Sequence, residues 1–410
     1  MSELLNPDVA LQQLLTHIPA PTVMNIPIEE AYSRVLAEPV VATLDLPPFD
    51  NAAMDGYAVI SADVERSPTQ LDVVQDIPAG ATSPQPLQPG QAARIMTGAP
   101  LPAGADAVIP VEQTDQTWHR DATQPLAPTV TIRTPAAPGV NIRPTGQNIQ
   151  QGQPILEAGT PLRPQDIGMI ASLGLSQVRV FASPTVAILG SGDELAPVGD
   201  QLKPGQIYDS NSYTVAALVQ ANGGIPVRYN PAADTLEAVR AQFRDALQQK
   251  PDLIVSTAGV SVGAFDVVRS VLDELGEIDF WRVNVRPGKP LAFGQVKGVP
   301  FFGLPGNPVS AMVTFDLFVR PAMRKLLGLQ TNPPTQTAVT EEEITSDGRR
   351  TYVRVTLRRQ GAELMASVTG TQSSGALMSM VLADGLLIVP EGQTEVAAGT
   401  RLPVRLLQPV

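Results

Sequence analysis

The chain has 410 residues, a net charge of −12 and no cysteine. Its length predicts several domains, since one domain usually spans about 100–200 residues, and its acidity argues against a general nucleic-acid-binding protein. Without cysteine there are no disulfides or thiolate metal sites, and with only two histidines we expect no histidine-rich metal centre. We find neither a signal peptide nor an apolar run near about 18 residues, so we expect a cytoplasmic protein that does not span a membrane.

The first half of the chain predicts helices on either side of a β-rich part. Residues 7–18 have apolar side chains at helical spacing behind Pro7, and residues 28–37 favour a second helix. From about residue 57 to 140, short β-like runs alternate with Pro and Gly, which predicts a compact β domain. Residues 164–173 begin like a helix, and we expect this helix to pack beside the N-terminal one.

From residue 184 to about 327, strands alternate with helices, which predicts a mostly parallel sheet covered on both faces. The loops after parallel strands then lie at one edge of the sheet. After residue 328 the β-like runs return, and alternation in 351–359 predicts a half-exposed strand of a small all-β domain. The predicted strands of the α/β part are 185–190, 225–229, 252–257, 280–285, 291–296 and 300–304, and its predicted helices are 211–222, 234–249, 266–275 and 307–327.

Four loops at the predicted sheet edge have the composition of an anion site. Gly190–Glu194 combines two glycines with two acids, and Asp209–Asn211 supplies capping residues for a helix. The third loop is 257–263, and the fourth is 303–308, where Asn307 and Pro308 suit a helix start. Helix N-termini present free N–H groups and partial positive charge, so they attract oxyanions.

Charged side chains near these loops complete the prediction. Four carboxylates would repel an anion unless a divalent metal lay between them, so the sequence predicts a phosphate-bearing ligand with Mg²⁺. Each feature also has a purely structural explanation: a glycine turn, a helix cap, an acid that complements a helix dipole, or a surface charge. The cations are Arg282, Arg286 and Lys289, and the carboxylates are Asp193, Glu194, Asp209 and Asp266.

Long motifs spread over the whole chain carry a resemblance to a known family. The chain resembles the molybdopterin molybdenumtransferase family, which includes MoeA and the matching domain of gephyrin. The motifs are PPFDNAAMDGYA (47–58), RIMTGAPLPAGADAVIP (94–110), SGDEL (191–195), GQIYDSN (205–211), GVSVG (259–263), RPGKPLAFG (286–294) and GLPGNPVSA (303–311).

The resemblance implies a multidomain α/β plus β fold in four regions. An elongated domain with helical and linker parts comes from two segments, 1–46 and 141–183, and a β domain is inserted at 47–140. A three-layer α/β molybdopterin-binding domain spans 184–327, and a domain like a β-barrel spans 328–410. It also implies a homodimer whose active site lies at the subunit interface.

The implied reaction belongs to molybdenum cofactor biosynthesis. Molybdate is inserted into adenylylated molybdopterin with Mg²⁺, and AMP is released. A separate molybdopterin adenylyltransferase and recipient molybdoenzymes are the expected partners, and we expect no nucleic acid and no membrane.

The resemblance also implies roles for individual residues. Catalytic roles fall to Asp193, Glu194, Asp55, Thr97 and Asp266, with Asp55 and Thr97 contributed across the dimer, and metal binding falls to Asp193, Glu194 and Asp209. Substrate binding falls to Ser191, Gly192, Asp209, Asn211, Gly259, Ser261, Gly263, Arg282, Arg286, Lys289, Pro305, Asn307, Pro308 and Ser310.

Several positions depart from the family pattern. Ser191 replaces the usual threonine but keeps a hydroxyl. Negative charge is lost where acids are usual, at Gln147, Asn148, Thr235 and Ala264. These losses favour an alternative, a catalytically weakened homologue that binds molybdopterin or acts as a scaffold. A general nucleotide or sugar-phosphate enzyme on the same fold is a weaker hypothesis, because fold alone does not give function.

Overall fold

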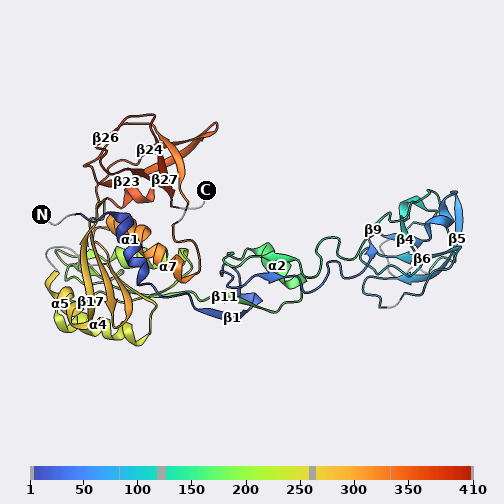
Figure 1. Ribbon diagram of the computed structural model, residues 1–410, viewed down its shortest axis with the longest axis horizontal. Helices are drawn as coiled ribbons and strands as arrows, with labels where there is room; N and C mark the ends of the chain where they lie inside the picture. The colour runs from blue at the N-terminus through green and yellow to red at the C-terminus, as the bar shows by residue number, and fades with distance from the viewer. Residues whose placement is uncertain (1–3, 83, 118–125, 258–264, 333, 408–410) are drawn as a thin grey trace. The chain divides into compact units, whose positions relative to one another are not determined.

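The computed structural model describes residues 4–82, 84–117, 126–257, 265–332 and 334–407. The chain forms two compact units (Figure 1). No helix among these residues is long and apolar enough to cross a membrane. The first unit comprises Met1–Ala37, Gly159–Arg163 and Gln177–Val410, and the second comprises Glu38–Ala158 and Pro164–Ser176.

A six-stranded sheet forms the centre of the α/β part of the first unit. Its order is β15-β12-β16-β20-β19-β17. Strands β15, β12, β16 and β20 run parallel, whereas β19 and β17 join as antiparallel strands. The mostly parallel sheet expected from the sequence is therefore confirmed. The strands are β12 (Thr185–Leu189), β15 (Ile225–Arg228), β16 (Leu253–Ser256), β17 (Gly276–Arg282), β19 (Pro290–Val296) and β20 (Val299–Gly303).

Helices cover both faces of this sheet (Figure 1). On one face, residues of α4 and α5 pack with Ala187, Ile254 and Phe301. On the other, residues of α1, α3, α6 and α7 pack with Val186 and Val255. The strands are buried on both faces because β12 and β16 have almost no polar side chains. The helices are α1 (Pro7–Thr16), α3 (Ser210–Ala221), α4 (Leu236–Gln248), α5 (Phe265–Leu275), α6 (Pro308–Thr314) and α7 (Arg320–Leu326).

Two expectations about the N-terminal helices are wrong. Helix α1 does not belong with helix 164–173; its buried residues Ala10 and Leu14 lie in the core of the α/β domain. Residues 28–37 form only a 3₁₀ turn, η1 (Ile28–Glu30), because Ser33 has a φ of 63°, which no α-helix accommodates. The chain after Ser33 is extended, and its apolar residues Val35 and Leu36 form isolated β-bridges.

The long helix expected at 307–327 is divided into three parts. Helix α6 passes into a π-helical turn, η4 (Phe315–Val319), before α7 begins. Pro321 explains the change, because proline has no N–H to donate to the carbonyl one α-helical turn earlier. The π-helical turn places the buried Asp316 inside the junction between the α/β domain and the barrel.

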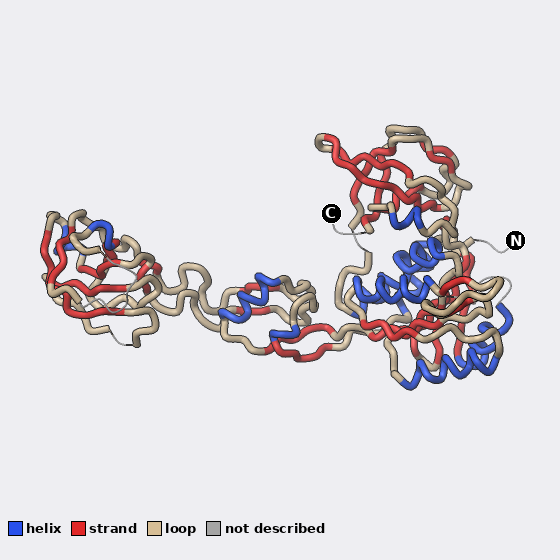
Figure 2. The backbone as a smooth tube through the Cα atoms, turned by 180° about the vertical axis from the view of Figure 1, so that it is seen from behind, coloured by secondary structure: helices blue, strands red, loops and turns tan. Residues whose placement is uncertain are grey.

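The C-terminal part of the first unit is a closed five-stranded barrel, consistent with the predicted barrel-like domain. Strands follow one another in the order β23-β24-β21-β27-β25, and β25 pairs back to β23. Strands predominate in this region (Figure 2). Its elements are β21 (Gln336–Thr340), β22 (Ile344–Thr345), β23 (Arg350–Gln360), β24 (Glu363–Val368), α8 (Met378–Val381), β25 (Gly385–Val389), β26 (Glu395–Val396) and β27 (Arg401–Leu406).

An ion-pair network joins the barrel to the α/β domain. Asp316 Oδ2 lies 2.6 Å from Nη1 of Arg405 on β27, and Asp316 Oδ1 accepts a hydrogen bond from Arg320 Nη1 at 2.8 Å. Near α1, Arg350 donates two hydrogen bonds of 2.7 Å to the Asp8 carboxylate. The side chains of Asp316 and Arg405 are each only 12% exposed, so their attraction is weakly screened.

Short strand pairs complete the first unit. β1 (Val23–Pro27) pairs with β11 (Gln177–Phe181), and β13 (Leu195–Ala196) pairs with β14 (Ile207–Tyr208). β18 (Val285–Arg286) extends the barrel by pairing with β23.

The second unit contains a five-stranded sheet in the order β7-β4-β6-β5-β8. Apolar clusters around Tyr57 and Ile95 cover its two faces. The predicted four-domain boundaries stay a prediction. The elements are β2 (Val40–Val41), β3 (Asn51–Ala52), β4 (Gly56–Val59), η2 (Ser61–Val64), β5 (Thr69–Ile77), β6 (Gln91–Ile95), β7 (Ala107–Pro110), η3 (Val111–Gln113), β8 (Thr129–Ile132), β9 (Ile142–Arg143), β10 (Pro154–Leu156) and α2 (Pro164–Ser172).

We expect Asp316→Asn to lower the unfolding free energy of the first unit by about 3 kcal/mol, because it leaves two largely buried arginines without their carboxylate. Urea unfolding followed by circular dichroism measures this loss. Asp273→Asn is the control: its pair with Arg269 is exposed, so the expected change is below about 1 kcal/mol. Equal effects of the two substitutions would show that the Asp316 network does not stabilise the unit.

Candidate functional site

A cleft of about 650 Å³ lies where the parallel strands of the α/β sheet end. Ser191 follows β12, Thr257 follows β16 and Pro305 follows β20. The expectation that these loops meet at one edge is confirmed. The cleft is lined by Ser191, Glu194, Leu195, Ile207, Tyr208, Asp209, Ser210, Asn211, Thr257, Pro290, Pro305, Gly306, Asn307, Pro308, Ser310 and Gly375.

Two buried oxygens in this cleft have no hydrogen-bond partner among the described residues: Ser191 Oγ and Asp209 Oδ2. Asp209 is 2% exposed, and its other oxygen, Oδ1, accepts a hydrogen bond of 3.1 Å from Ser212 N and so caps α3. A buried polar atom without a partner costs about 1–3 kcal/mol. These two atoms are therefore suited to contact a ligand.

The adjacent acids Asp193 and Glu194 have different surroundings. Glu194 lines the cleft, and its carboxylate lies against Gly192, where an added Cβ would approach Oε2 to 2.6 Å. Asp193 does not line the cleft; its Oδ1 accepts a hydrogen bond of 3.1 Å from Asp234 N. Burial raises the pKa of Asp234, and the charges of Asp193 and Glu194 add to this. The sequence could not reveal that the two acids diverge.

The carboxylates of the cleft fit a metal ion that takes only one or two of its ligands from the protein. Among the residues that the structure describes, no three histidine or acidic groups lie close enough to hold an ion, so Asp193, Glu194 and Asp209 do not form one ready ligand set. Mg²⁺ usually takes one or two carboxylates and completes its shell with water and phosphate oxygens. Asp209 Oδ2, which lacks a partner, and the Glu194 carboxylate fit that pattern.

The N-terminus of α6 forms another wall of the cleft. Asn307 occupies the N-cap position and Pro308 the first turn, as predicted. Asn211 Nδ2 donates a hydrogen bond of 2.7 Å to Gly306 O, so the loops before α3 and α6 are joined. Asn307 Nδ2 donates to Ser374 Oγ at 3.1 Å, which brings a barrel loop to the cleft. Sequence reasoning missed this loop, whose only signal was the small-residue run 373–375.

The three predicted cations are not gathered in the cleft. Arg282 and Lys289 are exposed, although Pro290, next to Lys289, does line the cleft. Arg286 lines a separate cavity of about 230 Å³ between the α/β domain and the barrel. Its Nη1 lies 3.8 Å from Asp347 Oδ2. The structure therefore places Arg286 apart from the loops that line the cleft.

Arg354 was missed by the sequence analysis and lines the same cavity as Arg286. It is 1% exposed, and within the described chain it pairs with no carboxylate; it donates to Ser379 Oγ at 3.2 Å and to Ser373 O at 3.1 Å. Burial lowers its pKa to about 10, and the nearby Arg286 contributes. The predicted half-exposed strand at 351–359 is wrong for its first five residues, which are all buried, because the barrel covers one side and the loop 370–376 covers the other.

The turn that carries Arg286 and Lys289 is held close to α6. Gly288 has a φ of +104°, and an added Cβ would lie 2.5 Å from Thr314 Oγ1. Only glycine fits both this backbone conformation and this contact. The close approach of Gly288 to Thr314 therefore fixes the position of the turn, which carries Arg286 on one side of Gly288 and Lys289 on the other.

In the second unit, the structure brings Asp55 and Thr97 together. Asp55 Oδ1 accepts hydrogen bonds of 2.7 Å from both Thr97 N and Thr97 Oγ1. The two family motifs that contain them therefore form one local structure. Their placement across a dimer stays a prediction.

Some predicted residues lie outside the described part of the chain. They are Gly259, Ser261, Gly263 and Ala264. Asp266 belongs to α5 by its backbone only, and its side chain is not described. Among the departures, Gln147 and Asn148 are exposed, and Thr235 caps α4 by accepting a hydrogen bond of 3.3 Å from Ala238 N.

Three family profiles together match almost the whole chain. The MoeA N-terminal region (domain I and II) matches residues 5–174, the "Probable molybdopterin binding domain" matches 187–325, and the MoeA C-terminal region (domain IV) matches 337–407. The chain belongs to the molybdopterin molybdenumtransferase family.

Similar proteins from other organisms match almost the whole length of this chain. A protein of Mycobacterium tuberculosis (strain CDC 1551 / Oshkosh) called molybdopterin molybdenumtransferase 2 is 40% identical over 397 residues, covering 93% of this chain and 94% of its own. A molybdopterin molybdenumtransferase of Haemophilus influenzae is 35% identical, covering 97% of each chain. The crystal structure of a molybdopterin biosynthesis MoeA protein from Pyrococcus horikoshii superposes with a TM-score of 0.84 at 32% identity, covering 100% of both chains. The family is thus one of transferases in molybdenum cofactor biosynthesis.

We expect Gly288→Ala to destabilise the first unit by about 3–4 kcal/mol, since it adds left-handed backbone strain to a steric clash. Gly298→Ala is the matched control: its φ is +83° with nothing within 4 Å of the added Cβ, so only the backbone cost of about 1–2 kcal/mol remains. Urea unfolding measures both. Adding Thr314→Ala to Gly288→Ala restores part of the loss; no recovery would exclude the clash with Thr314.

We expect Asp234→Asn to raise the unfolding free energy at pH 7. A carboxyl whose pKa is higher in the folded state than its usual 3.8 binds more protons when folded, so its ionisation lowers stability as pH rises through that interval. The gain from the substitution should therefore disappear below pH 3.8. Thermal unfolding across this pH range tests the sign, and a gain that persists at low pH would contradict the assignment.

Proposed function

We propose that the protein inserts molybdenum from molybdate into adenylylated molybdopterin in a Mg²⁺-dependent reaction that releases AMP. The observation that carries the proposal is the cleft in which Ser191 Oγ and Asp209 Oδ2 are buried without partners. The relatives' printed names supply the molybdopterin and molybdenum, and the cleft supplies a site of the right chemistry.

The phosphate groups of the substrate would bind at the start of α3 and α6. The free N–H groups of the first turns stabilise oxyanions, and the hydroxyls of Ser191 and Ser310 line the same cleft. Asp209 and Glu194 would hold Mg²⁺, which neutralises phosphate charge and polarises the bond to be broken. Asp193 accepts a hydrogen bond from Asp234 N, so it would lie beside the metal site and contribute less to it than Asp209 and Glu194.

Hydrolysis of the adenylyl bond would use this arrangement. Water attacks the AMP phosphorus, the P–O bond to the molybdopterin phosphate breaks, and a proton leaves the attacking water. That proton would pass to solvent, which reaches the cleft beside the exposed Glu194. The oxyanion contacts at α3 and α6 would hold both phosphates in line during the attack.

Molybdate would bind near the cavity lined by Arg286 and Arg354. Arg354 has a buried charge and no carboxylate partner in the described chain, and arginine pairs readily with oxyanions. The Asn307–Ser374 hydrogen bond joins the barrel loop that borders Arg354 to the phosphate cleft. Lys289 and Arg282 would attract the anion from the exposed side of the turn.

We further propose that the protein acts as a homodimer in the cytoplasm. Asp55 and Thr97 of the partner subunit would complete the site. A molybdopterin adenylyltransferase would supply the substrate, and molybdoenzymes would receive the product.

A second candidate is a weakened homologue that binds molybdopterin without turning it over. The residues Gln147, Asn148, Thr235 and Ala264 favour it, because none of them is acidic where the family resemblance leads us to expect acids. Release of AMP from adenylylated molybdopterin in the presence of Mg²⁺ and molybdate distinguishes the two. Binding without AMP release and without formation of cofactor would support the weakened homologue.

We expect Asp209→Asn to lower the rate of AMP release at least about 100-fold, because it removes a buried charged oxygen from the cleft. Asp193→Asn should lower it less, since Asp193 does not line the cleft. The exposed Glu65→Gln has the same charge change and should leave the rate unchanged. The reverse order of Asp209 and Asp193 would overturn the assignment of Asp209 as the main metal ligand.

A further inference from the structure

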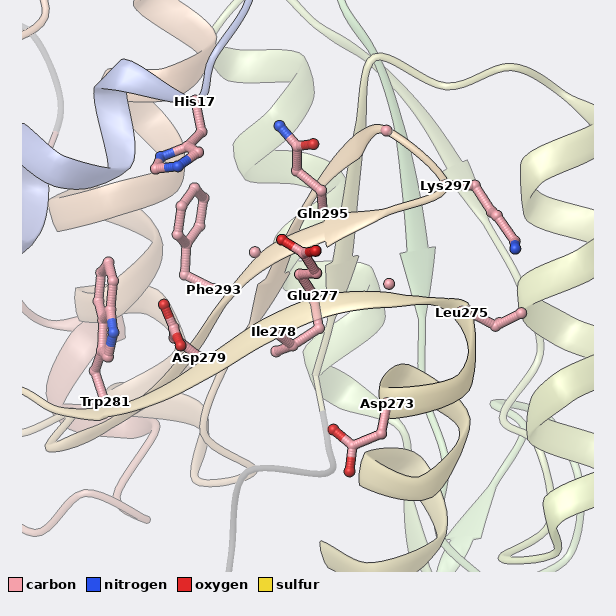
Figure 3. Close-up of a pocket in the computed structure, with 13 residues that line it drawn as sticks. His17, Asp273, Leu275, Glu277, Ile278, Asp279, Trp281, Phe293, Gln295 and Lys297 are labelled. Atoms are coloured by element: carbon pink, nitrogen blue, oxygen red, sulfur yellow. The ribbon is translucent and has the colours of Figure 1, made fainter.

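A second large cavity lies away from the cleft, at the β17 edge of the α/β sheet. It measures about 680 Å³, and none of its lining residues lines the cleft. Its wall is aromatic: the ring centroid of Phe293 lies 5.8 Å from that of His17 and 5.6 Å from that of Trp281 (Figure 3). Nothing in the proposed reaction uses this cavity.

Two acids flank the aromatic wall on the same face of the sheet. Glu277 and Asp279 are two residues apart on β17, so their side chains point the same way. They lie opposite Gln295 and Phe293 on β19, and Figure 3 shows both carboxylates on the side of Phe293. Both acids are exposed, and among the described residues neither makes a hydrogen bond or ion pair.

The other charged side chains at the cavity do not neutralise the carboxylates of Glu277 and Asp279. Asp273 adds another carboxylate, although it lies 3.7 Å from Arg269. Lys297 lies in the turn just after β19 (Figure 3). Adjacent like charges repel, so a partner that brings cations to this face would gain favourable energy.

β17 is also the end strand of the sheet. It pairs with β19 on one side, and within the described chain its outer backbone has no strand beside it from 276 to 281. Immediately beyond, the chain itself adds to this edge: Leu5 N donates to Arg282 O, and Asn284 N donates to Leu5 O, each at 2.8 Å. The edge therefore already accepts one extended segment in parallel.

We propose that the outer edge of β17 is the docking site for an extended segment of a partner protein with basic residues at alternating positions. The segment adds to β17 as a strand. Its cations face Glu277 and Asp279 because side chains of paired strands share the period of two. Their apolar stems pack on Trp281 and Phe293, where cation–π contact adds attraction. A nucleic acid does not fit, because its phosphates would meet carboxylates.

A synthetic peptide with a fluorescent label tests the proposal on the full chain. The probe alternates lysine and threonine over about ten residues, and the comparison peptide has the same composition in two blocks. Fluorescence anisotropy should show tighter binding of the alternating peptide by at least threefold. The double variant Glu277→Gln/Asp279→Asn should lose at least fivefold in affinity.

The matched control is Glu29→Gln/Glu30→Gln, which removes the same charge from two adjacent exposed acids of η1 and should bind as the unchanged protein does. Amide hydrogen exchange gives a second measurement: the peptide should slow exchange in residues 277–281. A Trp118→Phe background leaves Trp281 as the single tryptophan, whose fluorescence should change on binding.

Three results would overturn the proposal. Equal binding of the two peptides would mean attraction by net charge alone. Unchanged affinity in the Glu277/Asp279 variant, with more aggregation, would mean that the acids serve only to keep the sheet edge from pairing with other copies. Binding without slower exchange in β17 would place the peptide elsewhere.

Discussion

The parallel register of three strands is the constraint on which the cleft depends. The last residues of β12, β16 and β20 lie side by side, with Leu189 opposite Ser256 and Ser256 opposite Gly303. The three loops therefore leave the sheet at one level, and their first polar atoms converge. A shift of one residue in any strand would move its loop by about 3.3 Å along the sheet. The backbone pairing that holds the sheet together thus also aligns the site.

The barrel depends on a second alignment, at the π-helical turn between α6 and α7. α6 begins at the cleft, and the turn that follows presents Asp316 to Arg405 of the barrel. One continuous helical segment therefore borders the ligand site at its start and binds the neighbouring domain at its middle. This explains why residues of two domains, Asn307 and Ser374, can meet within hydrogen-bond distance.

The sequence predicted well what local patterns control. Strands without polar residues and helices with clear caps gave the α/β architecture, and loops after strands gave Ser191, Asp209 and Asn307 as lining residues. The predictions failed where contacts between residues far apart in the chain determine the structure. The buried Arg354 is hidden inside an alternating strand, because the loop 370–376 and Ser379 cover the face that periodicity assigns to solvent. The divergence of Asp193 from Glu194 depends on a hydrogen bond to the backbone of Asp234, forty-odd residues away in the chain.

Asp209 illustrates how a helix cap and a ligand oxygen can belong to one side chain. Oδ1 fixes the first turn of α3, while Oδ2 lies in the cleft without a protein partner. Whatever binds Oδ2 restrains the rotation of the carboxylate and so keeps Oδ1 at Ser212 N. Because linkage is reciprocal, fraying of α3 weakens ligand binding, and a bound ligand reduces the fraying. The first turn of α3 is therefore a structural element whose local stability reports directly on occupancy of the cleft.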